Sequence, residues 1–369
     1  MLTSMVSSPV DYFVETGMLP TSILGIEATT NQAVCHLVPN PDIATNRYVW
    51  YALKTKIPEL LTKRVGGAQP NISQQIIKKT KIPLPPIAEQ RRIVEILDQA
   101  DALRKKRAEA DEIAERILPV LFIKMFGDPA TNPKGWDLVT LEQISDGNIR
   151  NGLSPSNKGT YNGEVLTLSA ITQGEFDSSA RKFAKFVVEP PDDKMPRQSD
   201  LLVCRGNGNL NLVGCAKFPD QDYDGVLFPD TMIGVSIDFS VIKKNYLETL
   251  WSSDSTRAQI EQRARTTNGT HKINQKALSS IEIMLPDLAL QEKFESAATQ
   301  IKKTMFQKEQ SHSKLEILFQ TLLHRAFSGE LTAEWRKAHM QELLQEMEHQ
   351  AKVLGIEHKL EYEQLGMFE

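Results

Sequence analysis

The stretch PLPPIAEQRRIVEILDQADALRKKRAEADEI, residues 83–113, decides the fold of this chain. Pro83, Pro85 and Pro86 run directly into a long, charged and periodic segment. Proline cannot continue a central strand, but it suits the first turn of a helix. The stretch therefore predicts a short strand over residues 80–85, closed by the prolines, and a long helix that begins immediately after them.

The segment after the prolines carries apolar or small residues at alternating steps of three and four, the heptad pattern of a coiled coil. The predicted stripe of this first helix is Ile93, Ile96, Ala100, Leu103, Ala110, Ala114, Ile117 and Leu121. A second stripe follows later, at Phe294, Ala298, Ile301, Met305, Leu315, Phe319 and Leu322. Each helix would run roughly 35–40 residues and needs a partner, and Pro119 should kink the end of the first.

The two helices belong to an internal repeat. The segment GAQPNISQQIIKKTKIPLPPIAEQRRIVEILDQA, residues 67–100, aligns without a gap with NGTHKINQKALSSIEIMLPDLALQEKFESAATQI, residues 268–301, at a constant offset of 201. Pro85 falls on Pro286 and Gln90 on Gln291. In both copies the middle of the helix turns polar, a device that fixes register in coiled coils. A repeat sets the architecture of a chain, so it takes precedence over single motifs.

The block between the helices predicts a domain of mixed strands and helices. Short strand candidates separated by Gly, Asn, Asp and Pro are followed by a helical pattern over residues 242–265. The segment from Asn46 parallels the one from Lys244 with a small gap. The fold class is α+β, with two long antiparallel coiled-coil helices. The predicted regions are 1–85 (the end of a first domain of the same kind), 86–127 and 287–329 (the long helices), 128–286 (a complete domain) and 330–369 (a helical tail).

Composition narrows the function classes. The chain has 369 residues, 40% of them hydrophobic, and a net charge of −4, so any attraction to nucleic acid has to be local. It contains no run of about 18 apolar residues, and its start lacks the pattern of a signal peptide, so a cytoplasmic location is expected. The three cysteines form no C-x-x-C pair and are expected to be small buried hydrophobes.

With these motifs in hand, the sequence resembles the specificity subunit of type I restriction–modification systems. The resemblance covers roughly residues 27–335 and is carried by IPLPPIAEQRRIVEILDQAD, DLLVCRGNG, IMLPDLALQEKF and LLHRAFSGELTAEWR. It implies target-recognition domains held apart by an antiparallel pair of long helices, each domain reading half of a split DNA site. The sequence departs from the family pattern in its first 85 residues, which parallel only the end of a recognition domain.

The resemblance also implies partners and cofactors. The chain itself would bind no cofactor and catalyse no reaction. Methyltransferase subunits, docked on the helices, would use S-adenosylmethionine to methylate adenine, and a nuclease or translocase subunit would add ATP and Mg²⁺. Because the first domain lacks its front, one hypothesis is a homodimer, paired through the long helices, that reads a palindromic split site.

No catalytic motif is present: a P-loop, a G-x-S-x-G elbow and an H-E-x-x-H pair are all missing from the sequence. The leading candidate for DNA contact is CRGNGNLNLVG, residues 204–214, because glycines allow close approach to phosphates and Arg and Asn side chains pair with guanine and adenine. The alternative is an Asn-Gly hairpin without a ligand. RARTTNGTHK, residues 263–272, comes second, with an exposed loop as its alternative. The candidate residues are Arg150, Asn151, Arg181, Lys182, Arg205, Asn207, Asn209, Asn211, Arg263, Arg265, Asn268, His271 and Lys272.

Two rival functions remain at this point. The chain could be an interaction protein that occupies methyltransferase subunits, or pairs with itself, without reading DNA. It could also be a free-standing nuclease with coiled-coil arms, although no motif supports that reading. A plain dimerisation coil is the simplest alternative for the helices themselves, and the strand-and-proline unit that precedes each helix argues against it.

Overall fold

The computed structural model describes residues 21–25, 34–63, 72–267 and 269–356. The chain divides into unit 1, residues 1–110 and 309–369, and unit 2, residues 111–308. The division passes through both long helices, so that each unit holds the beginning of one helix and the end of the other. In the part of the chain that the structure describes, no helix is long and apolar enough to cross a membrane.

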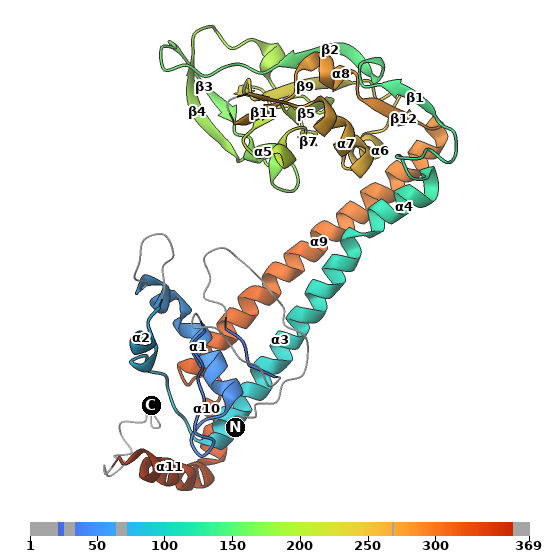
Figure 1. Cartoon of the computed structure of the whole chain (residues 1–369). Helices are drawn as coiled ribbons and strands as arrows, with labels where there is room; N and C mark the ends of the chain where they lie inside the picture. The colour runs from blue at the N-terminus through green and yellow to red at the C-terminus, as the bar shows by residue number, and fades with distance from the viewer. Residues whose placement is uncertain (1–20, 26–33, 64–71, 268, 357–369) are drawn as a thin grey trace. The chain divides into compact units, whose positions relative to one another are not determined.

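The long helices are α3 (Ile87–Glu115), which is followed by α4 (Ile117–Phe126), and α9 (Leu288–Phe327) (Figure 1). Helix α3 ends at Glu115, four residues before Pro119. A proline has no N–H for the carbonyl group four residues earlier, here that of Glu115, and its ring crowds that carbonyl. The predicted interruption of the first helix is therefore confirmed, and it lies one turn before the proline that causes it.

The predicted stripe of the first helix is wrong at three positions. Leu103 is 57% exposed and Ile117 45%, and Ala110 is exposed as well. In unit 1 the inward position next to Leu103 belongs to Arg104, whose guanidinium lies 4.2 Å from the centre of the Phe319 ring. Its Nη2 atom also lies 2.6 Å from a carboxylate oxygen of Glu316. Arg104 thus occupies the interface position that the apolar pattern assigned to Leu103.

Unit 1 is built on α1 (Asn46–Thr62) and α2 (Gln74–Lys78), together with the start of α3 and the end of α9. Its core joins aromatic residues of α1 to apolar residues of both long helices, so the start of α3 lies against the end of α9. The tyrosine rings of α1 contact phenylalanines of α9, with centroid distances of 5.4 Å for Tyr48–Phe327 and 6.4 Å for Tyr51–Phe319.

The strand predicted for residues 80–85 does not form. These residues are extended but pair with no strand among the residues that the structure describes. Their counterpart in the repeat, β12 (Glu282–Leu285), pairs antiparallel with β1 (Asp137–Thr140). A strand needs a ladder partner for its backbone groups. In unit 1 the carbonyl of Pro83 instead accepts a hydrogen bond from the Tyr48 hydroxyl, at 2.9 Å.

A buried glutamine near the start of each long helix makes the same contacts in both units. Gln90 accepts from the backbone N–H of Thr45 (3.0 Å) and donates to the carbonyl of Pro85 (2.8 Å). Gln291 accepts from the N–H of Lys243 (2.9 Å) and donates to the carbonyl of Pro286 (2.8 Å). Gln90 and Gln291 thus make equivalent contacts at positions that the sequence alignment pairs.

The helical tail packs on unit 1 through α10 (Ala333–Ala338) and α11 (Met340–Leu354). Glu89, buried at the start of α3, accepts hydrogen bonds from Thr332 (2.6 Å) and from the guanidinium of Arg336 (2.7 Å). Glu346 of α11 accepts from the backbone N–H of Ala88 (2.8 Å), and a carboxylate is favourable at the N-terminus of a helix. The described part of the tail is therefore an integral element of unit 1.

Unit 2 is a domain of mixed strands and helices, as predicted. Its helices are α5 (Ser169–Thr172), α6 (Lys244–Trp251), α7 (Asp254–Arg263) and α8 (Gln275–Ser279). Two larger sheets have the strand orders β2-β9-β5-β7 and β4-β3-β8. Their strands are β2 (Ser145–Asn151), β3 (Tyr161–Leu166), β4 (Arg181–Phe186), β5 (Asp200–Cys204), β7 (Ala216–Lys217), β8 (Val226–Leu227) and β9 (Met232–Ile237).

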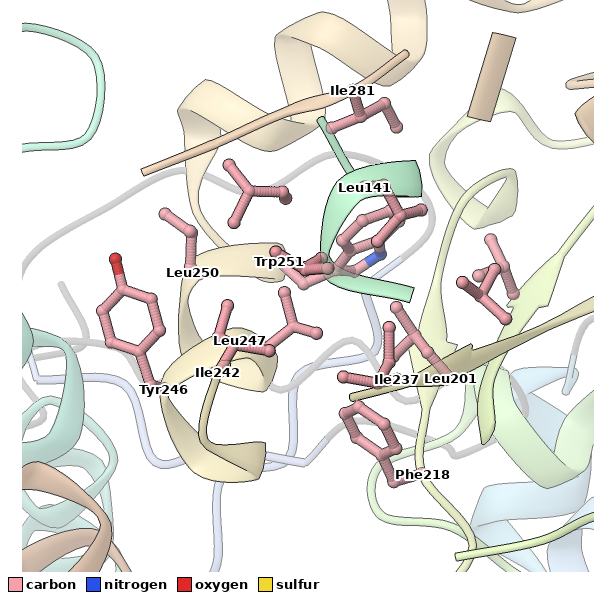
Figure 2. Close-up of a cluster of buried hydrophobic side chains, with 14 of the residues drawn as sticks. Leu141, Leu201, Phe218, Ile237, Ile242, Tyr246, Leu247, Leu250, Trp251 and Ile281 are labelled. Carbon is pink, nitrogen blue, oxygen red and sulfur yellow. The ribbon is translucent and has the colours of Figure 1, made fainter. Parts of the chain in front are cut away.

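The main core of unit 2 lies between helix α6 and the β2-β9-β5-β7 sheet. Figure 2 shows the side chains of Tyr246, Leu250 and Trp251 gathered with Leu201 and Ile237 of the sheet. The Tyr246 hydroxyl donates to the carbonyl of Met284 (2.6 Å), as Tyr48 does to Pro83 in unit 1. This core positions α6 and α7 behind the loops described below.

The buried glutamine of unit 2 yields a stability prediction. Replacing Gln291 by leucine leaves the N–H of Lys243 and the carbonyl of Pro286 buried without a partner. We expect the free energy of unfolding of unit 2 to fall by about 2–4 kcal/mol, measured by urea denaturation. Gln300→Leu, exposed on the same helix, is the matched control and should change it by less than about 0.5 kcal/mol. Equal losses in the two variants would contradict the capping role.

Candidate nucleic-acid interface

The structure brings the two leading candidate segments together in one small sheet of order β10-β11-β6. Strand β6 (Gly206–Asn207) comes from the first segment, and β10 (Arg265–Thr267) and β11 (Thr270–Lys272) come from the second. His271 pairs with Asn207 on one side and with Thr266 on the other. Two loops that the sequence singled out separately thus form one surface.

Two cations stand opposite each other on this sheet. Arg265 pairs in register with Lys272, and both residues are exposed. In the described part of the chain, neither of them makes a salt bridge. Like charges directly across a strand pair are unfavourable by themselves. An anion placed between them would remove that repulsion, and the phosphates of a nucleic acid backbone are such anions.

Gly206 allows the Lys272 side chain to cross β6. A Cβ atom built at Gly206 would lie 3.0 Å from Cγ of Lys272 and 3.4 Å from the carbonyl oxygen of His271. Such contacts are closer than side chains normally make, so the neighbouring lysine would have to shift. The absence of a side chain at Gly206 therefore leaves room for the side chain of Lys272.

The first segment is a chain of small turns. Oδ1 of Asn207 accepts from the N–H of Asn209 (2.9 Å), and Oδ1 of Asn209 accepts from the N–H of Asn211 (3.0 Å). These are Asx turns, in which a short polar side chain replaces a backbone acceptor. The side-chain N–H groups of the asparagines remain as donors, and Asn209 and Asn211 are exposed.

Arg257 of α7 holds this loop from behind, and no motif in the sequence singled it out. Its guanidinium donates to the carbonyls of Val213 (2.6 Å) and Leu210 (3.1 Å). Trp251 Nε1 donates to the carbonyl of Gly214 (2.8 Å). At Gly214, φ is +81° and a Cβ atom would lie 2.6 Å from Ile260, so glycine is required there.

Arg205 lies at the junction of the strands. Its N–H donates to the carbonyl of Thr231 (2.8 Å), and its own carbonyl accepts from Ile273 (2.9 Å). One guanidinium nitrogen donates to the carbonyl of Asp230 (3.2 Å). Cys204 beside it is buried, which raises the pKa of its thiol to about 11. The prediction that the cysteines are buried is confirmed for Cys204, whereas Cys35 and Cys215 are only partly buried.

Arg150 requires a correction. It was a candidate for DNA contact, but it is only 8% exposed and forms a bidentate pair with Asp200 (2.9 and 2.7 Å). Its Nε also donates to the carbonyl of Asp193, and the guanidinium lies over the Phe228 ring. With these donors engaged inside the domain, Arg150 holds the fold and is withdrawn as a contact.

The remaining candidates lie in other settings. Asn151 belongs to β2, and its buried Oδ1 has no hydrogen-bond partner in the described part of the structure. Arg263 donates to Ser280 and to the carbonyl of Gln259. Arg181 and Lys182 are exposed on β4. Asn268 falls outside the described residues.

This surface can interact with a ligand through positive charge and hydrogen bonds. Cationic and amide donors surround backbone turns, an arrangement that suits phosphates and base edges. Within the described ranges, no group of three or more His, Cys, Asp or Glu side chains is placed to hold a metal ion.

Comparison with known proteins identifies a family model that matches part of the chain. Residues 19–114 match the family model described as "Type I restriction modification DNA specificity domain". The chain is similar in sequence to the specificity subunits of type I restriction–modification systems, the resemblance that the sequence indicated.

Two curated relatives show how far the similarity extends. The chain is 27% identical to the type I restriction enzyme EcoKI specificity subunit of Escherichia coli K12, over 72% of this chain and 61% of that protein. It is 26% identical to the StySPI specificity subunit of Salmonella potsdam, again over 72% and 61%. The chain therefore spans about three fifths of the length of these relatives.

A solved structure shares the fold. A chain from the structure titled "Structural basis underlying complex assembly and conformational transition of the type I R-M system" superposes with a TM-score of 0.51 at 19% identity. The alignment covers 79% of this chain and 73% of that one. At this identity the likeness concerns the fold alone.

The buried arginine pair yields the second prediction. Arg150→Met leaves Asp200 charged and buried without its partner, so we expect unit 2 to lose about 3–5 kcal/mol of stability in urea denaturation. Arg197→Met breaks the ion pair with Asp224, which is 85% exposed, and should cost no more than about 1 kcal/mol. The double variant Arg150→Met/Asp200→Leu should recover most of the loss. A harmless single variant would return Arg150 to the list of DNA contacts.

Proposed function

We propose that this chain is a non-catalytic subunit that recognises a DNA sequence within a type I restriction–modification enzyme. The observation that carries the proposal is the convergence of two loops, which brings the Arg265–Lys272 pair of the second loop next to the asparagine donors of the first. The cations would contact phosphates, while Asn207, Asn209, Asn211 and Arg205 would reach base edges. The names of the curated relatives support this assignment.

A full complex would contain methyltransferase subunits that bind S-adenosylmethionine and methylate adenine. A nuclease or translocase subunit would bring ATP and Mg²⁺. A bipartite site would follow if two recognition surfaces, from one chain or from a pair of chains, engage the DNA together. These are expectations for the assembly, and each of them depends on the partners.

Helix α4 and the end of α3 carry a surface that suits such a partner. Ile113, Ile117, Val120 and Ile123 are 67%, 45%, 64% and 47% exposed, at the three- and four-residue spacing of one helix face. Contiguous exposed apolar surface commonly marks a protein interface. We propose that methyltransferase subunits dock on this face.

The function is tested by the methylation pattern that the complex produces. The chain is co-expressed with a cognate methyltransferase subunit in a host without DNA methylation, and modified adenines are mapped by sequencing. A split sequence motif is expected. A stable complex without any motif would favour the rival in which the chain occupies methyltransferase subunits without reading DNA.

The cation pair yields the third prediction, for the same complex. Arg265→Ala/Lys272→Ala should weaken binding to duplexes with and without the motif, because phosphate contacts carry no sequence information. The slope of log K against log salt concentration should fall by about 2. Lys293→Ala/Lys303→Ala, which removes two exposed lysines of α9, is the control with equal charge loss. Identical salt slopes for the two double variants would exclude the proposed phosphate contact.

The docking face yields the fourth prediction. Ile117→Asp/Val120→Asp should abolish co-purification of the methyltransferase subunit, because two carboxylates would be buried in an apolar interface. Both residues are exposed, so the stability of the chain alone should stay within about 1 kcal/mol. Val188→Asp, at another exposed valine of unit 2, is the control. Retention of the partner by the double variant would place its docking site elsewhere.

A further inference from the structure

Strand β4 presents an aromatic side chain to solvent. Phe183 lies in the middle of the strand and is 82% exposed. Along the strand, Ala184 and Phe186 point toward the interior, where Phe186 is fully buried with Val165 and Leu227. Residues two apart share a face of a strand, so Phe183 shares its outward face with Arg181 and Lys185, both exposed.

The charge on this face is positive. Opposite Phe183 on β3 stands Glu164, which forms a 3.0 Å ion pair with Arg181. Asn162, which is neutral, stands opposite Lys185. Lys182 is exposed beside Phe183 on the strand. On its own face the aromatic ring is therefore accompanied by two cations and one carboxylate, and Lys182 adds an exposed cation on the other face of this edge strand of the β4-β3-β8 sheet.

This combination favours nucleic acid over protein as the occupant. The cores of protein–protein interfaces are depleted in lysine, whereas DNA surfaces carry closely spaced negative charges. At about 3.3 Å per residue, Arg181 and Lys185 lie about 13 Å apart along the strand. That span reaches phosphates on both sides of a minor groove about 6 Å wide, with the ring of Phe183 midway between them.

We propose that the outward face of β4 enters the minor groove of duplex DNA, with Phe183 as an apolar wedge at a base-pair step. Arg181 and Lys185 contact the flanking phosphates. Apolar wedges of this kind partially unstack a step and bend the duplex. This inference rests on the proposed function and adds a second DNA-contacting surface to it. The energy of inserting Phe183 would depend on how easily the base-pair step deforms, and therefore on its sequence.

The outward face of β4 and the loop of Arg205 are connected through the backbone of unit 2. Strand β3, which carries β4, pairs in parallel with β8 (Val226–Leu227). The segment that follows β8 reaches Thr231, whose carbonyl accepts from the N–H of Arg205 at 2.8 Å. The β4 face and the Arg205 loop are thus linked through a few residues of ordered backbone.

The test uses the complex of the full chain with its methyltransferase subunit and a duplex carrying the motif found by methylation mapping. 2-Aminopurine replaces successive adenines of the motif, and its fluorescence rises where a base unstacks. We expect a rise at one step with the natural chain. Phe183→Ala should abolish that rise and weaken binding by about 10-fold, without changing the salt slope, because no charge is lost.

Three further variants sharpen the result. Phe183→Trp should keep both the fluorescence rise and the affinity. Arg181→Ala/Lys185→Ala should reduce the salt slope by about 2. Phe306→Ala removes another exposed aromatic ring, 62% exposed on α9, and should change nothing in the DNA assay. Because Phe183 makes few contacts in the folded chain, its variants should denature like the natural protein.

The outcomes separate this inference from the proposed function. If the natural complex shows no preference for any sequence, the proposed function fails. If it is selective and responds to Arg265→Ala/Lys272→Ala, while Phe183→Ala binds and unstacks DNA as before, only the β4 inference is overturned. Loss of the methyltransferase subunit from Phe183→Ala would make this face a protein interface and would also overturn it.

Discussion

The buried glutamine at the start of each long helix is the contact on which the rest of the molecule depends. A single amide holds a proline carbonyl just before the helix and the backbone N–H just before a second, shorter helix. In unit 2 that shorter helix is α6, whose Trp251 holds the carbonyl of Gly214. Helix α7 follows and clamps the same loop through Arg257. A hydrogen-bonded path thus runs from Gln291 to the loop that carries the candidate asparagines.

Short apolar runs separated by Gly, Asn, Asp and Pro predicted most of the larger strands of unit 2, because such residues favour the turns that bound strands. Strands β5, β7 and β9 lie within the segments predicted as strands, 200–206, 212–218 and 231–237, and β3 and β4 overlap the predicted segments 163–171 and 182–188 but begin slightly earlier. Strand β2 was missed because its sequence, SDGNIRN, is polar and turn-like. It forms because β9 provides a ladder partner, which is a tertiary effect.

The long helices show a different limit of sequence reasoning. A stripe drawn through apolar residues chose Leu103 and Ala110, yet the inward position beside Leu103 is that of Arg104. An arginine can fill an interface position when a carboxylate and an aromatic ring receive its guanidinium, as Glu316 and Phe319 do here. Those partners lie more than two hundred positions along the chain and cannot be read from the local pattern.

The candidate site was predictable as residue types but not as an arrangement. Glycine, asparagine and basic residues marked both loops, whereas their pairing through Asn207 and His271 depends on register between segments about sixty residues apart. Arg150 shows the opposite case. Its neighbours in the sequence resemble an exposed loop, and only the fold reveals that Asp200 binds both of its terminal nitrogens.

A chain with a net charge of −4 can still attract DNA, because charge acts over short distances in salt. At physiological ionic strength the screening length is about 8 Å, so remote carboxylates contribute little at a given surface. The attraction at a given surface depends on the charges close to it, such as those of Arg265 and Lys272. The same screening confines the attraction to those surfaces. A protein with this distribution should bind DNA weakly through its general surface, and sequence recognition benefits when such competing contacts are weak.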